Sequence, residues 1–491
     1  MKLELGEWTP DLPDLGNPGA TEALNVLPSA SSYLPLLAVS PITDALTARC
    51  RGAMTARDKI GQVYNFAGDE TNLYSLSGNT HSDISNGTYG LQASENWEFV
   101  KFGETVIAVC IDESPQSITL GGAAFADLAG SPPKARHCAV VSNFVVFANI
   151  DDGTARPNRI QWAGINSTTS WTPDADTQAD YQDLFSDANY GGGWIMGVEG
   201  TGDAATIFQE YSIWRMTYEG SPTIFRFDEV LPGIGTPSKN SITTEGRITH
   251  FLGQDGFYQL IDGTQIKPIG KNKVDNYFFN DFDATYPEKV IGASDPNSGI
   301  VAWIYPGSGN TNGQPNKIIF YDWINDKWSR AEQIVEWIYA AIGQGYTLEQ
   351  LDNVSTSIDT LTPSLDSRAW MGGALQLAVY DADNKKGTFG GTAMNATIET
   401  GEAQVNENGR AHITGARPLV DGAGTTLTVQ IGTRDLQTDS NSFTTAEAVN
   451  TETGIAHFRS DARYHRLRIN TSGDFTHAKG LEIFSVLTGK R

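Results

Sequence analysis

The sequence predicts an all-β protein, in which a β-propeller is followed by a C-terminal β-sandwich or barrel. Three observations predict this fold class. Glycine, with 51 of 491 residues, and aromatic residues, at 10%, are abundant, which favours short strands joined by tight turns. Hairpin-like units recur over residues 59–398. Residues 399–491 change character and alternate apolar with polar positions.

Residues 1–58 are predicted to form an extended N-terminal arm. Prolines recur there too often for helices, at Pro10, Pro13, Pro18, Pro28, Pro35 and Pro41. Such an arm either reaches a neighbouring molecule or completes a blade within its own chain. The residues alone leave both alternatives open.

Residues 59–398 repeat one pattern, in which two β-rich apolar runs flank a short turn. Trp97–Ile111, His137–Ile150 and Lys317–Trp328 are examples. Their turns contain Gly103, Ser142-Asn143 and Asn325-Asp326, residue types that supply the positive φ that hairpin turns need. Each unit is therefore predicted to be a hairpin.

The hairpin centres follow one another at roughly 40 to 50 residues, about the length of a four-stranded propeller blade. That spacing predicts about 6 to 8 blades over residues 59–398. A pair of β-sandwiches with the same hairpin density is the alternative, because no WD or kelch signature marks the repeats. Thr347–Ser367 breaks the pattern and is predicted to be a short helix or an ordered loop.

Residues 399–491 are predicted to form a compact β-sandwich-like domain. Leu427, Val429 and Ile431 alternate with polar residues, and Leu467 and Ile469 do the same. This period of two is typical of a strand with one buried face. A closing strand is expected near Leu487.

The net charge of −24 is unevenly distributed. Residues 401–491 contain ten basic and ten acidic residues, so the remaining 24 basic and 48 acidic residues all lie in 1–400. This balance disfavours a conventional nucleic-acid-binding protein, which needs lysine and arginine to neutralise phosphates. The acidity indicates either plain solubility or a surface that repels polyanions.

The three cysteines, Cys50, Cys110 and Cys138, are too few for a disulfide framework, so folding in a reducing cytoplasm is expected. No run of 18 apolar residues predicts a membrane span. The N-terminal stretch lacks the apolar core of a secretion signal.

Motifs of catalysis, cofactor binding and metal binding are missing from the sequence. The seven histidines are scattered, and HExxH, CxxC, GxSxG and GxxxxGK[ST] do not occur. We therefore predict no catalytic, cofactor-binding or metal-ligating residues and no cofactor. A propeller-type glycan hydrolase remains the rival hypothesis, because a pair of catalytic carboxylates has no sequence signature. Its Asp-box repeat is matched only by Asn166–Trp171, which lacks both the Asp and the Gly.

Several short sequence motifs occur along the chain in an order that resembles one protein family. They include Pro157–Trp162 (PNRIQW), Phe208–Met216 (FQEYSIWRM), Asp255–Tyr258 (DGFY) and Arg463–Ile469 (RYHRLRI). Together they resemble the tail hub or nozzle family of short-tailed bacteriophages, also described as packaged-DNA-stabilisation or tail tubular proteins.

The resemblance implies a structural virion protein and not an enzyme. It implies a homo-oligomeric ring, usually a hexamer, that closes the DNA exit channel, retains packaged DNA and conducts it during ejection. The implied partners are the head–tail adaptor, other tail proteins, passing double-stranded DNA that is not tightly bound, and the host envelope at the distal end. The implied location is the phage tail, assembled in the bacterial cytoplasm. A receptor-binding adhesin of the tail is a further alternative.

Two expectations follow for such a ring. An acidic wall would repel the duplex and let it slide. Neighbouring subunits would meet through heterologous interfaces, to which the arm of residues 1–58 is a candidate contributor. Trp8, Tyr33 and Leu34 are its candidate inter-subunit anchors, because large apolar side chains dominate such contacts.

Overall fold

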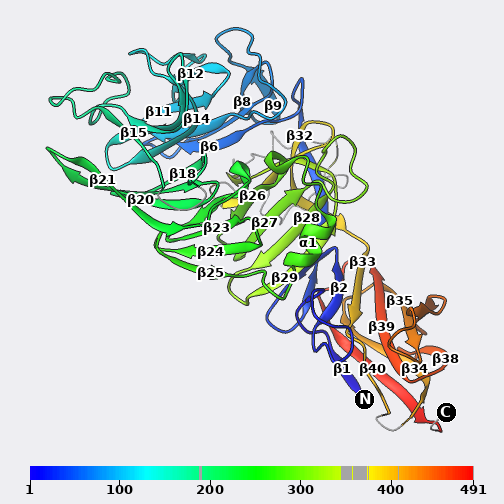
Figure 1. Ribbon diagram of the computed structural model, residues 1–491. Helices are drawn as coiled ribbons and strands as arrows, with labels where there is room; N and C mark the ends of the chain where they lie inside the picture. The colour runs from blue at the N-terminus through cyan, green and yellow to red at the C-terminus, as the bar shows by residue number, and fades with distance from the viewer. Residues whose placement is uncertain (187–190, 344–356, 358–372, 374, 407–408, 490–491) are drawn as a thin grey trace.

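A computed structural model describes the whole chain except residues 187–190, 344–356, 358–372, 374, 407–408 and 490–491. The predicted break at Thr347–Ser367 therefore lies, apart from Ser357, outside the described residues. The regular secondary structure is almost entirely strand and confirms the predicted fold class, a propeller with an additional β-sandwich (Figure 1). Its helical elements in the described chain are short: α1 (Asp275–Asp281), η1 (Lys239–Ser241) and η2 (Pro287–Lys289).

The propeller has seven four-stranded blades in the described part of the chain. Blades one to three are β6 (Ala53–Arg57), β7 (Val63–Gly68), β8 (Leu73–Ser77) and β9 (Thr80–Asp83); β10 (Glu98–Phe102), β11 (Thr105–Cys110), β12 (Glu113–Thr119) and β13 (Ala126–Asp127); and β14 (Lys134–Val141), β15 (Phe144–Asp151), β16 (Ala155–Trp162) and β17 (Asp180–Asp183).

Blades four to six continue the same order. They are β18 (Ile195–Thr201), β19 (Ala204–Gln209), β20 (Ser212–Gly220) and β21 (Ile224–Pro232); β22 (Thr243–Glu245), β23 (Ile248–Leu252), β24 (Phe257–Ile261) and β25 (Gln265–Pro268); and β26 (Ile291–Asp295), β27 (Ile300–Tyr305), β28 (Lys317–Asp322) and β29 (Lys327–Glu332). All neighbouring strands within these blades are antiparallel.

The predicted hairpin turns account for this regularity. Gly103 has a φ of 60°, Ser142 of 53° and Asp326 of 55°, and each lies between two antiparallel strands of one blade. Left-handed backbone at these positions matches the twist of the flanking strands. Apolar side chains then fill the space between blades, as Val146 and Ile207 do between blades three and four.

The seventh blade is assembled from both ends of the chain. Its strands are β30 (Val335–Ile342), β31 (Leu375–Asp381), β32 (Lys385–Ala393) and, outermost, β5 (Leu37–Ala45). β5 pairs antiparallel with β32, with Ser40 opposite Thr388. The first strand β30 contacts β6 of blade one, so the ring is closed.

The prediction of one extended arm over residues 1–58 was therefore wrong. The segment is divided, because β6 begins blade one at Ala53 and β5 completes blade seven. The earlier strands, β1 (Lys2–Glu4), β2 (Ala20–Leu24), β3 (Val26–Pro28) and β4 (Tyr33–Pro35), join the C-terminal domain. The alternative that this segment completes a blade within its own chain holds for β5, whereas β1, β3 and β4 join the sandwich and β2 lies between the two domains.

The C-terminal domain is a sandwich of two sheets, as predicted. One contains β2, β33 (Ala396–Thr400), β39 (Tyr464–Ser472), β35 (Thr426–Arg434), β36 (Ser442–Phe443) and β37 (Glu447–Ala448). The other contains β1, β3, β4, β40 (His477–Leu487), β34 (Ala411–Asp421) and β38 (Ala456–Ala462). Ile431 and Leu467 of the first sheet share a core with Ile413 and Leu481 of the second.

A seam formed by the N-terminal strands joins the two domains. β2 lies beside β29 of blade six on one edge and beside β33 on the other, so one sheet runs from the propeller into the sandwich. Arg330 of β29 donates two hydrogen bonds to the Glu22 carboxylate of β2, at 2.7 and 2.8 Å. A paired carboxylate and guanidinium of this geometry fix the two strands relative to each other.

The three candidate anchors lie at this seam. Trp8 has an exposed fraction of 0%, packs edge-on against Tyr277 at 5.0 Å between ring centroids, and donates from Nε1 to the Thr21 carbonyl. Tyr33 is 2% exposed and donates from its hydroxyl to the Gly6 carbonyl at 2.8 Å. Leu34 is half-buried opposite Leu27. Trp8 and Tyr33 thus contact their own chain, and the prediction that they anchor a second subunit was wrong, because their rings have no free surface.

Replacing Trp8 by alanine should destabilise the single chain. Removing a fully buried aromatic side chain costs about 3–5 kcal/mol in the free energy of unfolding. Urea denaturation of Trp8→Ala, compared with Trp194→Ala at a position that is 51% exposed, measures the difference. An unchanged denaturation midpoint for Trp8→Ala would contradict the seam as described.

Candidate functional site on the propeller axis

The first strands of all seven blades surround an axial cavity of about 520 Å³. Its wall mixes polar groups with aliphatic side chains, among them Val100, Val140, Val198, Ile242 and Ile338. The cavity is far too small to hold a DNA duplex. A conduit for DNA would therefore have to lie between subunits and not along the axis of one propeller.

Two carboxylates lie among these aliphatic side chains, Glu98 on β10 and Glu199 on β18. Glu98 reaches the first strand of the next blade, where it accepts hydrogen bonds from His137 Nδ1 at 2.9 Å and from the Cys138 backbone N–H at 2.8 Å. These bonds hold Glu98 in place, with Nδ1 as the nitrogen of His137 that donates to the carboxylate.

Glu199 has a different environment. Burial raises its pKa to about 7, the nearby charge of Glu98 raises it further, and a hydrogen bond with Thr244 opposes both. Because burial and a like charge both disfavour the ionised form, Glu199 exchanges its proton near neutral pH. No cation acts on it among the described residues.

An ion network lies at the end of the cavity where the first strands of the blades begin. Glu95, which precedes β10, accepts two hydrogen bonds from Arg136 of blade three and one, at 2.9 Å, from Lys239 of η1. Burial opposes the ionisation of Glu95, but Lys239 and Arg136 outweigh it and lower the pKa of this carboxyl to about 2. The network ties blades two and three to the segment between blades four and five.

A smaller cavity of about 200 Å³ adjoins this network and shares Glu98, Lys239 and Trp337 with the axial cavity. Two of its polar atoms are buried without a partner in the described chain, His137 Nε2 and Asn96 Nδ2. Buried polar atoms without partners are rare in folded proteins and call for an explanation.

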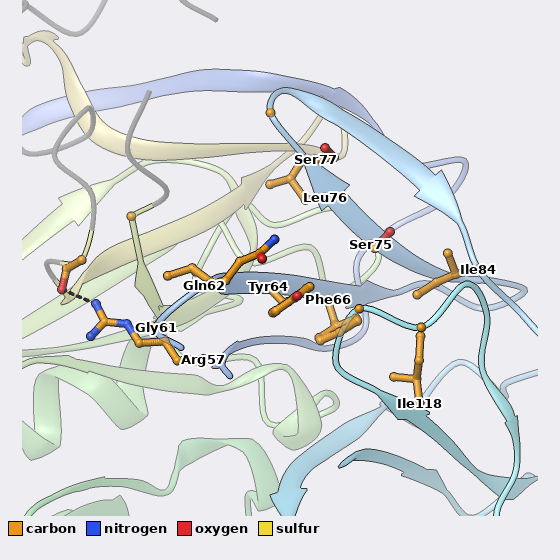
Figure 2. A pocket seen from close by; sticks show the side chains of 16 residues that line it. Arg57, Gly61, Gln62, Tyr64, Phe66, Ser75, Leu76, Ser77, Ile84 and Ile118 are labelled. Atoms are coloured by element: carbon orange, nitrogen blue, oxygen red, sulfur yellow. Dashed lines mark hydrogen bonds between the residues drawn. The ribbon is translucent and has the colours of Figure 1, made fainter. Parts of the chain in front are cut away.

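A second pocket, of about 940 Å³, lies beside blade one (Figure 2). Tyr64, Phe66, Ile84 and Ile118 give it an apolar wall, and Arg57, which donates to the Gly373 carbonyl at 2.7 Å, is its only charged lining residue among those described. It offers no pair of acid and base, so the axial cavity is the better candidate.

Metal and thiol chemistry find little support in the described chain. No group of three or more His, Cys, Asp or Glu side chains there could hold a metal ion. All three cysteines are buried, and burial raises the thiol pKa of each of them, to about 12 for Cys110. Within the described residues, no helix is both long and apolar enough to cross a membrane.

Comparisons with known proteins concern the fold alone. The sequence matches no protein-family model and no curated protein. The Pan2 WD40 domain of Neurospora crassa is 10% identical with a TM-score of 0.39, over 74% of this chain and 96% of that domain. BamB of Moraxella catarrhalis is 9% identical with a TM-score of 0.37, over 79% of this chain and 99% of that one. An extracellular domain from B. thetaiotaomicron is 11% identical with a TM-score of 0.41, and the match spans 79% of this chain but only 44% of that structure.

The stability of the chain should fall as the pH rises from about 5 to about 8, in part through Glu199. The folded state keeps the Glu199 proton up to its raised pKa of about 7, whereas the unfolded state releases it near 4.5. Glu199→Gln removes this contribution, so the variant should gain stability relative to the parent as the pH rises. Urea denaturation at several pH values measures the gain. Glu219→Gln, at an exposed ion pair with Arg226, is the matched control. Equal pH dependence in both variants would contradict the assignment.

Proposed function

We propose that the chain is a structural subunit of a phage tail hub or nozzle, which assembles into a homo-oligomeric ring around the DNA exit channel. In this proposal the ring retains packaged DNA, conducts it during ejection and contacts the adaptor above it. The observation that carries the proposal is the difference in net charge between the two domains. The strongly acidic residues 1–400 hold the propeller, while the charge-balanced residues 401–491 form most of the sandwich.

The free end of the sandwich has the features of a subunit contact. Met1, Leu436, Val486 and Leu487 are 58–65% exposed there. Thr488 donates its backbone N–H to the Arg410 carbonyl, and the Arg410 side chain pairs with Asp435, which brings Leu487 and Leu436 close together. Apolar side chains on a surface without net charge favour association.

The acidic body suits a channel wall. A duplex carries about one negative charge per 1.7 Å of its axis, and a wall rich in lysine and arginine would bind it tightly. With 48 acidic and 24 basic residues in positions 1–400, the surface instead repels the duplex, at a cost that salt screens.

A ring of subunits is expected for the full chain in solution, with six copies as the resemblance implies. The double variant Val486→Asp/Leu487→Asp should reduce it to monomers without changing the thermal unfolding of the chain, because both residues already face solvent. Native mass spectrometry measures the assembly state. The control is Ile60→Asp, at a position on the propeller that is 80% exposed.

A wild-type chain that stays monomeric at high concentration would refute the ring. A ring whose lumen is lined mainly by lysine and arginine would refute the repulsive wall, and a map of the surface potential of the assembled ring decides this second point.

A glycan hydrolase is the second candidate, because Glu98 and Glu199 both line the axial cavity. A carboxyl group with a pKa of about 7 can donate a proton at neutral pH, which is the task of the general acid in glycoside hydrolysis. Glu98 would then serve as the ionised partner.

If the chain hydrolyses glycans, Glu199→Gln should lower the release of reducing ends from host surface polysaccharides by about 10²–10⁴-fold. The exposed variant Glu219→Gln should leave the rate unchanged. Absence of release by the wild-type chain, or equal release by both variants, removes this candidate and leaves the ring proposal untouched.

A further inference from the structure

We propose that the axial cavity binds a small alkylammonium ion, with the ammonium group between Glu98 and Glu199 and the carbon chain along the valine and isoleucine wall. This site uses the two carboxylates of the hydrolase candidate, but its occupancy by an ammonium ion requires neither ring assembly nor hydrolysis. It rests on a count of charges, on an unused acceptor and on the chemistry of the wall.

The first argument is the charge balance of the axial and adjoining cavities. The titratable groups that line them in the described chain are Glu98, Glu199, Arg136, Lys239, His137, Cys138 and Tyr339. Both cations are already engaged by the single carboxylate of Glu95, which leaves one surplus positive charge there. When Glu98 and Glu199 are both ionised, their two negative charges exceed this surplus positive charge by one. One further cation would therefore neutralise the site.

The second argument is the Nε2 atom of His137, which is buried without a hydrogen-bond partner among the described residues. The side chain is 3% exposed, lines the adjoining cavity and donates from Nδ1 to Glu98, so in the imidazole form Nε2 carries a lone pair. No described residue donates to this atom, although it is buried beside the Glu98 carboxylate. An ammonium group has three donors and no acceptor, and it would satisfy such acceptors without leaving one of its own unpaired.

The third argument distinguishes an alkylammonium ion from a metal ion. Ca²⁺ takes six to eight oxygen ligands and Mg²⁺ keeps a nearly octahedral shell, whereas this cavity offers two carboxylates, and no group of three or more His, Cys, Asp or Glu side chains in the described chain could hold a metal ion. Val140, Ile242 and Ile338 provide the surface that methylene groups prefer. The site thus suits a charged head on an apolar body.

Binding should depend on pH because the cation favours the ionised form of Glu199. With a pKa of about 7, about a tenth of Glu199 is ionised at pH 6 and about nine tenths at pH 8. The affinity should therefore rise about tenfold between these pH values. Below pH 7, binding should release protons to the buffer.

Isothermal titration of the full chain with n-butylammonium chloride at pH 6 and pH 8 tests the proposal. We expect saturable binding at one site, about tenfold tighter at pH 8, and no binding of n-butanol, the uncharged counterpart. Titration at pH 6 in two buffers of different ionisation enthalpy should reveal the proton release. Glu199→Gln should weaken binding at pH 8 at least about tenfold, while Glu219→Gln should bind as the wild type does.

Three results would overturn the site: no saturable binding by the wild type, equal binding of butanol, or equal binding by the two variants. If Glu199→Gln fails to fold, the comparison with butanol and the proton release of the wild type still decide the question. The assembly state of the chain bears on none of these measurements.

Discussion

The pairing of β5 with β32 is the interaction on which the rest of the structure depends. It joins residues near position 40 to residues near position 388 and turns an open row of blades into a ring. Without β5, β32 would present an unpaired edge of backbone donors and acceptors, and blade seven would have three strands. The axial cavity exists only because this closure brings β30 against β6.

The same N-terminal segment makes one body of two domains. After leaving β1 it passes between blade six and the sandwich, and its contacts there are buried on both sides. Trp8 packs on Tyr277 of α1, while Asn17 accepts a hydrogen bond from Gly19 within the seam. A joint built from a shared sheet, a half-buried ion pair and a buried tryptophan leaves little freedom for hinge motion between the two domains.

The sequence predicted the blades well because each is a local structure, specified by turn residues such as Gly103 and Asp326 and by the apolar runs around them. The division of the N-terminal segment could not be predicted, since the partner of β5 lies about 340 residues away. The sequence marked Trp8 and Tyr33 as side chains that would be buried. It could not show whether the residues that bury them belong to the same chain or to a neighbouring subunit. Glu98 and Glu199 could not be predicted as a pair, because no characteristic separation in the sequence marks two carboxylates that lie on different blades. Only the folded propeller brings them close enough for the charge of one to affect the pKa of the other.

The closing strand has one more consequence. Since β5 precedes the blades in the chain and completes the last of them, the slot beside β32 is the same in every copy of the protein. A neighbour's β5 would fit that slot as well as the chain's own, with identical hydrogen bonds, whenever two chains fold close together. Because β1–β4 precede β5 and pack in the seam and the sandwich, the strand would exchange only together with the whole N-terminal segment, and that exchange would link copies into domain-swapped oligomers.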